Sequence, residues 1–273
     1  MNIKNVFCTL FLKAFSLSNI VAQPKVIAHR GYWDDYTPQN SIASLKKAQE
    51  ADIYGSEFDV HLTSDGVLIL FHSNNINGMK IEETPYTKFK DLRIMDAQYG
   101  KLSKLSKNEE KIPTLEEFLK QGKKNKKTKL ILELKPHSSK ELEDKAVAAV
   151  VEMVEKVGVT NQIEYISFSL NICKEFVRLS PKTPVAYLKG DLSPQEVKAH
   201  NIPGIDYSLS VLKKNKHWIT DAHNLKMFVN VWTVNDKADM QEMIDAGVDF
   251  ITTDKPTLCK ELINANKTNK KKK

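Results

Sequence analysis

The chain of 273 residues has few cysteines and no long apolar run. Its three cysteines, Cys8, Cys173 and Cys259, are too few for a disulfide framework, and a chain of this length can build a core without one. No Cys and His residues stand at the spacing of a zinc site. Nowhere does the sequence approach the roughly 20 apolar residues that cross a bilayer, so we expect no transmembrane segment.

The net charge of +7 is unevenly distributed. Two of the excess positive charges, Lys4 and Lys13, lie in the first 22 residues, and five lie in residues 267–273, with no acidic residue in either stretch. Residues 23–266 are therefore neutral overall, whereas a nucleic-acid-binding domain carries a basic surface. We expect a small-molecule substrate and no nucleic-acid partner.

The N-terminus resembles a signal peptide. Lys4 precedes an apolar run at residues 6–12, and Ile20-Val21-Ala22 form a plausible cleavage point, although a lysine interrupts the apolar stretch. We expect residues 1–22 to be removed and the mature chain to be exported to the periplasm or the extracellular space. The alternative is a short N-terminal helix.

Short β-rich runs alternate with amphipathic helical segments through residues 23–265. Nine runs predict strands, at Lys25–His29, Ser56–Val60, Val67–Phe71, Lys129–Leu134, Glu164–Phe168, Pro184–Leu188, Gly204–Tyr207, Met227–Trp232 and Asp249–Thr252. Helical spacing, as in Val147, Val150, Val151 and Val154, falls between many of them. Such alternation over roughly 240 residues predicts an α/β fold, a (β/α)8 TIM barrel. Residues 266–273 are expected to form a basic disordered tail.

Nine strands are predicted, whereas such a barrel has eight. We explain the extra strand by a hairpin that two of the runs form. Ser56–His61 and Val67–His72 are too close for a parallel crossover, which needs about a dozen residues. They predict an antiparallel pair with a turn near Ser64-Asp65-Gly66, in which His72 lies opposite Glu57. This register depends on the turn, since a slip of one residue reverses the faces.

Residues 73–128 predict a small insertion after the strand that ends at His72. The segment has weak periodicity, several lysines and one clear helical pattern, from Pro113 to Lys120. Barrel enzymes commonly elaborate their substrate side in this way.

Acidic residues stand near the ends of the predicted strands, where a barrel places its active site. Glu57 and Asp59 are two apart and share one strand face, and Glu133 stands in another apolar strand. Each alone fits a salt bridge at the rim, but three carboxylates at one mouth repel one another unless a cation lies between them. Oxygen ligands favour a hard ion, so we expect one Mg²⁺ or Ca²⁺ ion held by these three residues.

Two histidines, His29 and His72, directly follow apolar strands. Beside the carboxylates they form a natural acid–base pair, because an imidazole pKa of about 6.5 suits both roles near neutral pH. Arg30 and Lys135 add positive charge for a phosphate group. Trp232 ends another strand. It is either a core residue or a residue that packs on the substrate, and we expect the second. These residues together predict metal-assisted hydrolysis of a phosphate ester.

Further motifs occur in order through most of the chain. They are Ile27–Gly31, Pro38–Ser41, Glu57–Val60, Asp65-Gly66, His72, Leu132–Lys135, Ser167-Phe168, Val231–Asn235 and Asp249–Pro256. This ordered set closely resembles the signature of the glycerophosphodiester phosphodiesterase family. The resemblance implies a triosephosphate-isomerase-type barrel that hydrolyses glycerophosphodiesters to glycerol 3-phosphate and an alcohol such as choline or ethanolamine.

The resemblance also implies roles for the residues named above. The three carboxylates would hold the ion, Arg30 and Lys135 the phosphate, and the substrate's own glycerol hydroxyl or a water would attack phosphorus. His29 and His72 would be base and acid, and we expect His72 to be the acid because its hairpin can project it across the mouth. Trp33 and Tyr36, after His29, are candidates for a substrate wall.

Two positions depart from the family pattern. The family usually has glutamate where Gln39 stands and aspartate where Ser73 stands. Gln39 still donates and accepts hydrogen bonds, whereas Ser73 lacks a carboxylate that orients a neighbour. The core residues are intact, so we expect activity with an altered metal affinity or substrate range.

Two other functions fit the same barrel. A phosphoinositide-type phospholipase C or a phospholipase D-like enzyme also uses two histidines beside a divalent ion, but a lipid-active enzyme is expected to expose an apolar loop, and residues 73–128 are mostly polar. A degenerate barrel kept for binding is expected to have lost a histidine or a metal ligand, and none is lost. Hydrolysis of a water-soluble glycerophosphodiester is therefore our main hypothesis.

Overall fold

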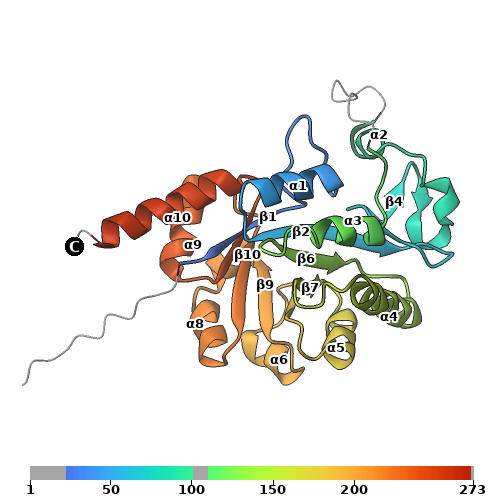
Figure 1. The fold of residues 1–273 in the computed structure, drawn as a ribbon. Helices are drawn as coiled ribbons and strands as arrows, with labels where there is room; N and C mark the ends of the chain where they lie inside the picture. The colour runs from blue at the N-terminus through green and yellow to red at the C-terminus, as the bar shows by residue number, and fades with distance from the viewer. Residues whose placement is uncertain (1–22, 101–109, 272–273) are drawn as a thin grey trace, which may run out of the picture.

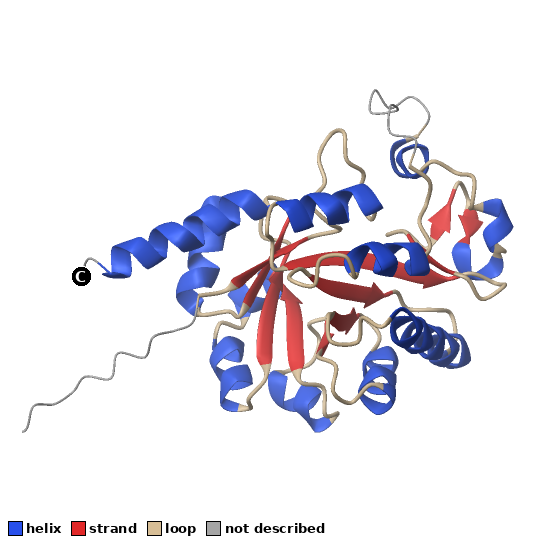
Figure 2. Cartoon of the chain, viewed as in Figure 1, coloured by secondary structure: helices blue, strands red, loops and turns tan. Residues whose placement is uncertain are grey.

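A computed structural model describes residues 23–100 and 110–271, so the expected signal peptide lies outside the described residues. Eight parallel strands form a closed barrel with helices around it, which confirms the predicted (β/α)8 fold (Figures 1 and 2). The barrel strands are β1 (Lys25–Ala28), β2 (Gly55–Leu62), β6 (Lys129–Leu134), β7 (Ile163–Ser167), β8 (Val185–Tyr187), β9 (Gly204–Ser208), β10 (Phe228–Trp232) and β11 (Phe250–Thr253). The barrel closes at β1, which pairs with both β2 and β11.

Helices surround the barrel and pack apolar residues against it. These outer helices are α1 (Ile42–Glu50), α3 (Leu115–Gly122), α4 (Lys140–Val157), α5 (Leu170–Leu179), α6 (Pro194–Ala199), α7 (Leu209–Lys214), α8 (His217–Asn224), α9 (Lys237–Ala246) and α10 (Pro256–Lys271). In α4, the Ser139 side chain caps the first turn, Gly158 ends the helix at φ +77°, and Val147 and Val154 are buried. No helix in the described part of the chain has the length and apolar character to cross a membrane.

The last helix extends further than the sequence analysis expects. Helix α10 continues through residues 266–271, which were assigned to a disordered tail, and it reaches beyond the barrel wall (Figure 1). Lysine is a good helix former and makes up half of residues 266–271, so this basic sequence can continue a helix that is anchored before it. Residues 272–273 lie outside the described part.

The strand alternation divides side chains between two apolar regions. Phe58 and Leu132 point outward into the main core between strands and helices, whereas Ile27, Ile131 and Ile166 pack inside the barrel. Since Glu57 and Asp59 flank Phe58 in β2, both carboxylates face the barrel interior. The predicted sharing of one strand face is therefore confirmed.

The hairpin forms, but its predicted register is wrong by one residue. Strand β3 (Leu68–Leu70) runs antiparallel to β2 with Val60 opposite Leu70, and not with His72 opposite Glu57. The cause is a loop of three residues, Ser64–Gly66, with Gly66 at φ +86°. Because β3 ends at Leu70, His72 lies in the bend that follows and not in the ladder.

The insertion is shorter than residues 73–128. It contains β4 (Asn75–Ile76), β5 (Met79–Lys80), the 3-10 helices η1 (Ile81–Glu83) and η2 (Tyr86–Lys88), and α2 (Ile94–Tyr99). These elements surround a small core that includes Phe71, Phe89 and Ile112, and they lie beyond the end of β2 (Figure 1). Helix α3 instead packs Phe118 into the main core, so it belongs to the barrel.

Candidate active site

A cavity of about 160 Å³ lies where the barrel strands end. It is lined by His29, Arg30, Glu57, Asp59, His72, Glu133, Lys135, Ile166, Phe168, Leu188, Asp206, Trp232 and Thr252. All eight site residues predicted from the sequence are among them. The structure therefore brings together side chains from β2, β6 and β10 and from the segments that follow β1 and β3.

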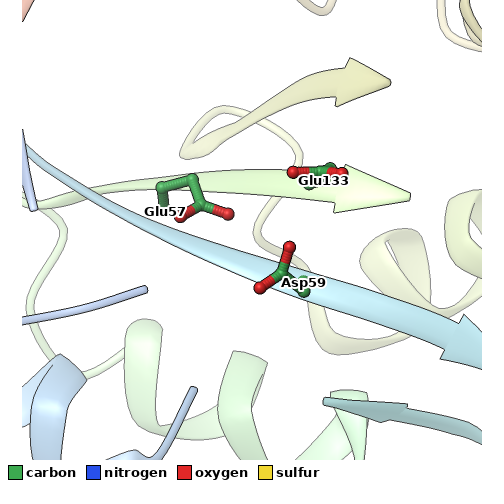
Figure 3. Close-up of side chains that lie close together, drawn as sticks. All are labelled: Glu57, Asp59 and Glu133. Atoms are coloured by element: carbon green, nitrogen blue, oxygen red, sulfur yellow. The ribbon is translucent and has the colours of Figure 1, made fainter. Parts of the chain in front are cut away.

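Three carboxylates converge in this cavity. Glu57, Asp59 and Glu133 are buried, and each has an oxygen within 4.8 Å of an oxygen of the others, between β2 and β6 (Figure 3). The strand pairing explains the convergence, because Asp59 lies directly opposite Glu133. Oε1 of Glu57 is buried and accepts no hydrogen bond from any described residue. This set of oxygen donors, one of them unpartnered, fits a hard divalent cation.

The pKa values record the repulsion within this cluster. Burial, with Asp59 and Glu133 nearby, raises the pKa of Glu57 well above its usual range. Burial also raises the pKa of Glu133 to about 7, against the effect of Lys135. Burial acts to raise the pKa of Asp59 too, but the positive charges of Lys135 and Arg30 hold it well below its usual range.

Lys135 bridges two of the carboxylates. Its Nζ lies 2.7 Å from Oδ1 of Asp59 and 2.7 Å from Oε1 of Glu133. Burial alone lowers the pKa of a lysine, but these two carboxylates raise it above the usual value. Lys135 is therefore a fixed positive charge at the centre of the mouth.

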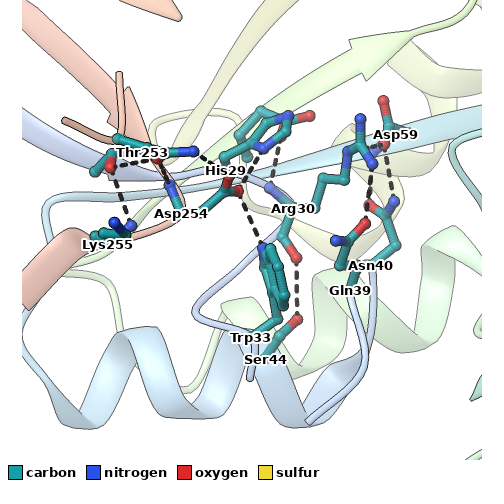
Figure 4. A network of polar contacts seen from close by, with 12 residues as sticks. His29, Arg30, Trp33, Gln39, Asn40, Ser44, Asp59, Thr253, Asp254 and Lys255 are labelled. Carbon is teal, nitrogen blue, oxygen red and sulfur yellow. Dashed lines mark hydrogen bonds and ion pairs between the residues drawn. The ribbon is translucent and has the colours of Figure 1, made fainter. Parts of the chain in front are cut away.

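The loop after β1 holds the carboxylates from the other side (Figure 4). The backbone N–H of Arg30 donates to Oε2 of Glu57 at 2.7 Å, and Nδ2 of Asn40 donates to Oδ2 of Asp59 at 2.8 Å. Arg30 Nη1 donates to Oε1 of Gln39 at 2.9 Å. The amide of Gln39 accepts this hydrogen bond although it is uncharged, so glutamine in place of the family's glutamate still holds Arg30 in position.

Gly31, at φ +83°, packs so closely on Ser44 that a Cβ atom has no room.

His29 is oriented by a carboxylate. Its Nδ1 lies 2.7 Å from Oδ1 of Asp254, which also accepts from Nε1 of Trp33 at 3.2 Å (Figure 4). Nδ2 of Asn235 donates to Oδ2 of Asp254 at 2.6 Å. Burial acts to raise the pKa of Asp254, but these hydrogen bonds lower it below its usual value. An ionised, immobilised Asp254 fixes the ring of His29 and leaves Nε2 for the cavity.

His72 lies at the exposed rim of the same cavity. Partial burial, together with the nearby Lys135, Arg30 and His29, lowers its pKa to about 4, against the attraction of Asp59. The imidazole is therefore neutral near pH 7.

The opposite half of the cavity is apolar. Ile166, Phe168, Leu188 and Trp232 line it, and the rings of Phe168 and Trp232 meet edge to face with centroids 5.6 Å apart. Nε1 of Trp232 donates to the backbone oxygen of Asp206 at 3.0 Å, which fixes the indole. The site thus combines a charged half for an anion with an apolar half for a carbon chain.

Residues 29–258 match the glycerophosphoryl diester phosphodiesterase family. The chain belongs to this family. It is therefore a phosphoric diester hydrolase, and the resemblance drawn from the sequence motifs is confirmed.

Solved and curated phosphodiesterases resemble the enzyme over most of their length. It is 45% identical to a glycerophosphodiester phosphodiesterase from Parabacteroides distasonis, with a TM-score of 0.83 over 89% of this chain and 98% of that one. It is 28% identical over 240 residues to the glycerophosphodiester phosphodiesterase of Bacillus altitudinis, which covers 85% of this chain and 95% of that protein. A phosphodiesterase from Oleispira antarctica, solved in complex with the product sn-glycerol-3-phosphate, is 25% identical, with a TM-score of 0.76 over 89% of this chain and 97% of that one.

Some residues of this phosphodiesterase site were not assigned from the sequence. Asp254 directly follows β11, just as His29 follows β1, and that position was the available signal. Asp206 lies inside a strand and gave no signal. Trp33 and Tyr36 were expected to form a substrate wall, but neither lines the cavity. Nε1 of Trp33 donates a hydrogen bond to Asp254, and Tyr36 is 78% exposed.

Proposed function

We propose that this enzyme hydrolyses glycerophosphodiesters to glycerol 3-phosphate and an alcohol, with one Mg²⁺ or Ca²⁺ ion held by Glu57, Asp59 and Glu133. The observation that carries the proposal is the convergence of three buried carboxylates with two histidines in one cavity. The product bound to the Oleispira antarctica relative supports the substrate class. When bound, such an ion polarises a phosphoryl oxygen and offsets the carboxylate repulsion.

Arg30 and Lys135 supply the remaining positive charge for the phosphate. Nε of Arg30 is buried, lies 3.7 Å from Oδ2 of Asp59 and donates no hydrogen bond within the described structure, so it is available to a phosphate oxygen. Trp232 and the apolar residues beside it pack against the carbon chain of one alcohol group.

The two histidines share the proton transfers. His72, neutral near pH 7, acts as the general base that takes the proton of the attacking oxygen, from the substrate's glycerol hydroxyl or from water. His29 acts as the general acid that protonates the departing alcohol, because the Asp254 carboxylate stabilises a positive imidazolium. This assignment reverses the sequence-based expectation that His72 is the acid.

A water-soluble substrate is favoured over a membrane lipid. Large apolar residues of the insertion, such as Ile81 and Phe89, are buried in its own core. Across the described ranges, the exposed large apolar side chains are Tyr36 and Tyr99. Two tyrosines are too few to form the contiguous apolar patch of several hundred Å² that a lipid surface requires.

The substrate proposal predicts release of glycerol 3-phosphate from glycerophosphocholine, glycerophosphoethanolamine and glycerophosphoglycerol when Mg²⁺ or Ca²⁺ is present. Coupling to glycerol-3-phosphate oxidation measures the product directly. Phosphatidylcholine and phosphatidylinositol vesicles serve as comparison substrates, and we expect little turnover of either. Turnover of the vesicles without turnover of the soluble diesters contradicts the proposal.

We further propose that the enzyme is exported after removal of residues 1–22. The proposal rests on the basic, apolar and small-residue segments of the N-terminal sequence. N-terminal sequencing of the protein from its native host is expected to begin near Gln23. An intact Met1 on most of the cellular protein contradicts export.

A further inference from the structure

Asp206 is a buried carboxyl group that the proposed mechanism does not use. It lies in β9, two residues before the strand ends, and its side chain faces the barrel interior and lines the cavity. Only 2% of the residue is exposed. Its Oδ1 is fully buried and has no hydrogen-bond partner among the residues that the structure describes.

The polar side chains beside Asp206 are already paired. Asn230 lies opposite Asp206 in the β9–β10 pairing. Nδ2 of Asn230 donates to Oγ1 of Thr252 at 2.8 Å, and Oδ1 of Asn230 accepts from the backbone of Val231 at 2.8 Å. This network satisfies Asn230 and Thr252 and leaves Oδ1 of Asp206, a residue of the cavity wall, without a partner among the described residues.

The carboxyl group of Asp206 shares the cavity lining with the apolar residues. Ile166, Phe168 and Leu188, from and just after the neighbouring strands β7 and β8, line the same space. A buried polar atom without a partner costs free energy, so such an atom in a binding cavity is a candidate for contact with a ligand. The ligand it fits is a carbon chain with a polar group.

The chemistry around Asp206 favours a hydroxyl over a cation. Burial raises the pKa of Asp206 to about 8, although Asn230 acts to lower it, and the nearby Glu133 adds to the increase. A cationic head group binds only the ionised carboxylate. A hydroxyl donates and accepts, so it pairs with Asp206 in either protonation state.

We propose that Asp206 binds a free hydroxyl of the alcohol that packs against the apolar half of the cavity, and that it is a specificity-determining residue for hydroxylated alcohols. The inference rests on the proposed phosphodiesterase function. The hydroxyl belongs either to the glycerol that remains on the phosphate or to the departing alcohol, and two pairs of substrates separate these sources.

The first pair is glyceryl p-nitrophenyl phosphate and 2-hydroxypropyl p-nitrophenyl phosphate. They differ by the terminal hydroxyl alone and keep the hydroxyl nearest the phosphate, so both retain the same internal nucleophile. The second pair is glycerophosphoglycerol and glycerophosphopropanol, which differ in the departing alcohol. We expect the wild-type enzyme to prefer the hydroxylated member of one pair by about 10–100-fold in kcat/KM.

Asp206→Leu is expected to reduce that preference to within about threefold of unity, because leucine has a similar shape without polar atoms. Asp206→Asn is expected to keep most of the preference, because an amide also donates and accepts. Glu164→Leu is the matched control: Glu164 is a buried carboxyl in β7 that is paired with the Tyr54 hydroxyl and lies outside the cavity lining. This control is expected to keep the wild-type preference.

Thermal unfolding shows which variants are folded, and Asp206→Ala takes the place of Asp206→Leu if the latter is not. Loss of preference in either pair supports the proposal and identifies the source of the hydroxyl. Preference that survives the loss of Asp206, or a wild-type enzyme without preference in both pairs, overturns it. A wild-type enzyme that cleaves no glycerol diester in the presence of Mg²⁺ or Ca²⁺ overturns the proposed function instead, and this inference with it.

Discussion

His29→Ala and His72→Ala are each expected to lower kcat by about 10²–10⁴-fold, the usual effect of removing a general acid or base. Cation binding is expected to change little, because neither imidazole is among the proposed ligands. The pH–rate profile of the wild type is expected to be bell-shaped, since one ring must be neutral and the other protonated in the same turnover.

The leaving group separates the two roles. Nitrophenolate departs without help from an acid. A nitrophenyl ester is therefore expected to rescue the kcat of His29→Ala much more than that of His72→Ala. Rescue of His72→Ala instead restores the assignment expected from the sequence, with His72 as acid. Steady-state kcat for an alkyl and a nitrophenyl diester, measured for both variants, distinguishes these results.

His223→Ala is the matched control for these variants. Its Nε2 lies 2.9 Å from Oδ2 of Asp249, so it resembles the His29–Asp254 pair, but neither His223 nor Asp249 lines the cavity. This variant is expected to keep wild-type kcat. Near-normal kcat in His29→Ala or His72→Ala, measured beside this control, excludes the two-histidine mechanism.

The barrel and most of its site were predictable because they depend on local pattern. Strands that alternate with helical spacing specify a parallel sheet, and the carboxyl ends of its strands lie at one mouth. Glu57 and Asp59 were assigned to one face from their spacing of two alone. His29, next to the end of β1, was placed at the mouth by the same rule.

What the sequence left open depends on single turns and distant contacts. The predicted hairpin has a loop of two residues, whereas the observed loop has three, with Gly66 at a positive φ. The extra loop residue shifts every facing pair of the hairpin by one position, which is why the predicted register is wrong. The partnership of His29 with Asp254 joins residues 225 positions apart, so no local spacing reports it. Asp206 looks like any polar residue in a strand until the neighbours that bury it are known.

Removal of divalent cations with a chelator is expected to abolish turnover, and Mg²⁺ or Ca²⁺ is expected to restore it. The reason is the cluster itself, because three buried carboxylates face Lys135 and Arg30, and one oxygen of Glu57 has no partner in the part of the chain that the structure describes. Binding also provides a readout that is independent of activity. An ion at 100 times its Kd stabilises the folded state by about 2.7 kcal/mol, which raises the Tm of a chain of this size by roughly 5–10 °C.

Glu57→Gln is expected to abolish both the turnover and the rise in Tm on adding the ion. Because the pKa of Glu57 is raised in the folded chain, its ionisation opposes folding as the pH rises above the ordinary carboxyl range, so cation-free Glu57→Gln is expected to be at least as stable as the wild type at pH 7. Glu164→Gln removes a buried carboxylate outside the cluster and is expected to keep both responses. Full activity of the metal-free wild type, or an unchanged thermal shift in Glu57→Gln, removes the basis for placing the ion among these carboxylates.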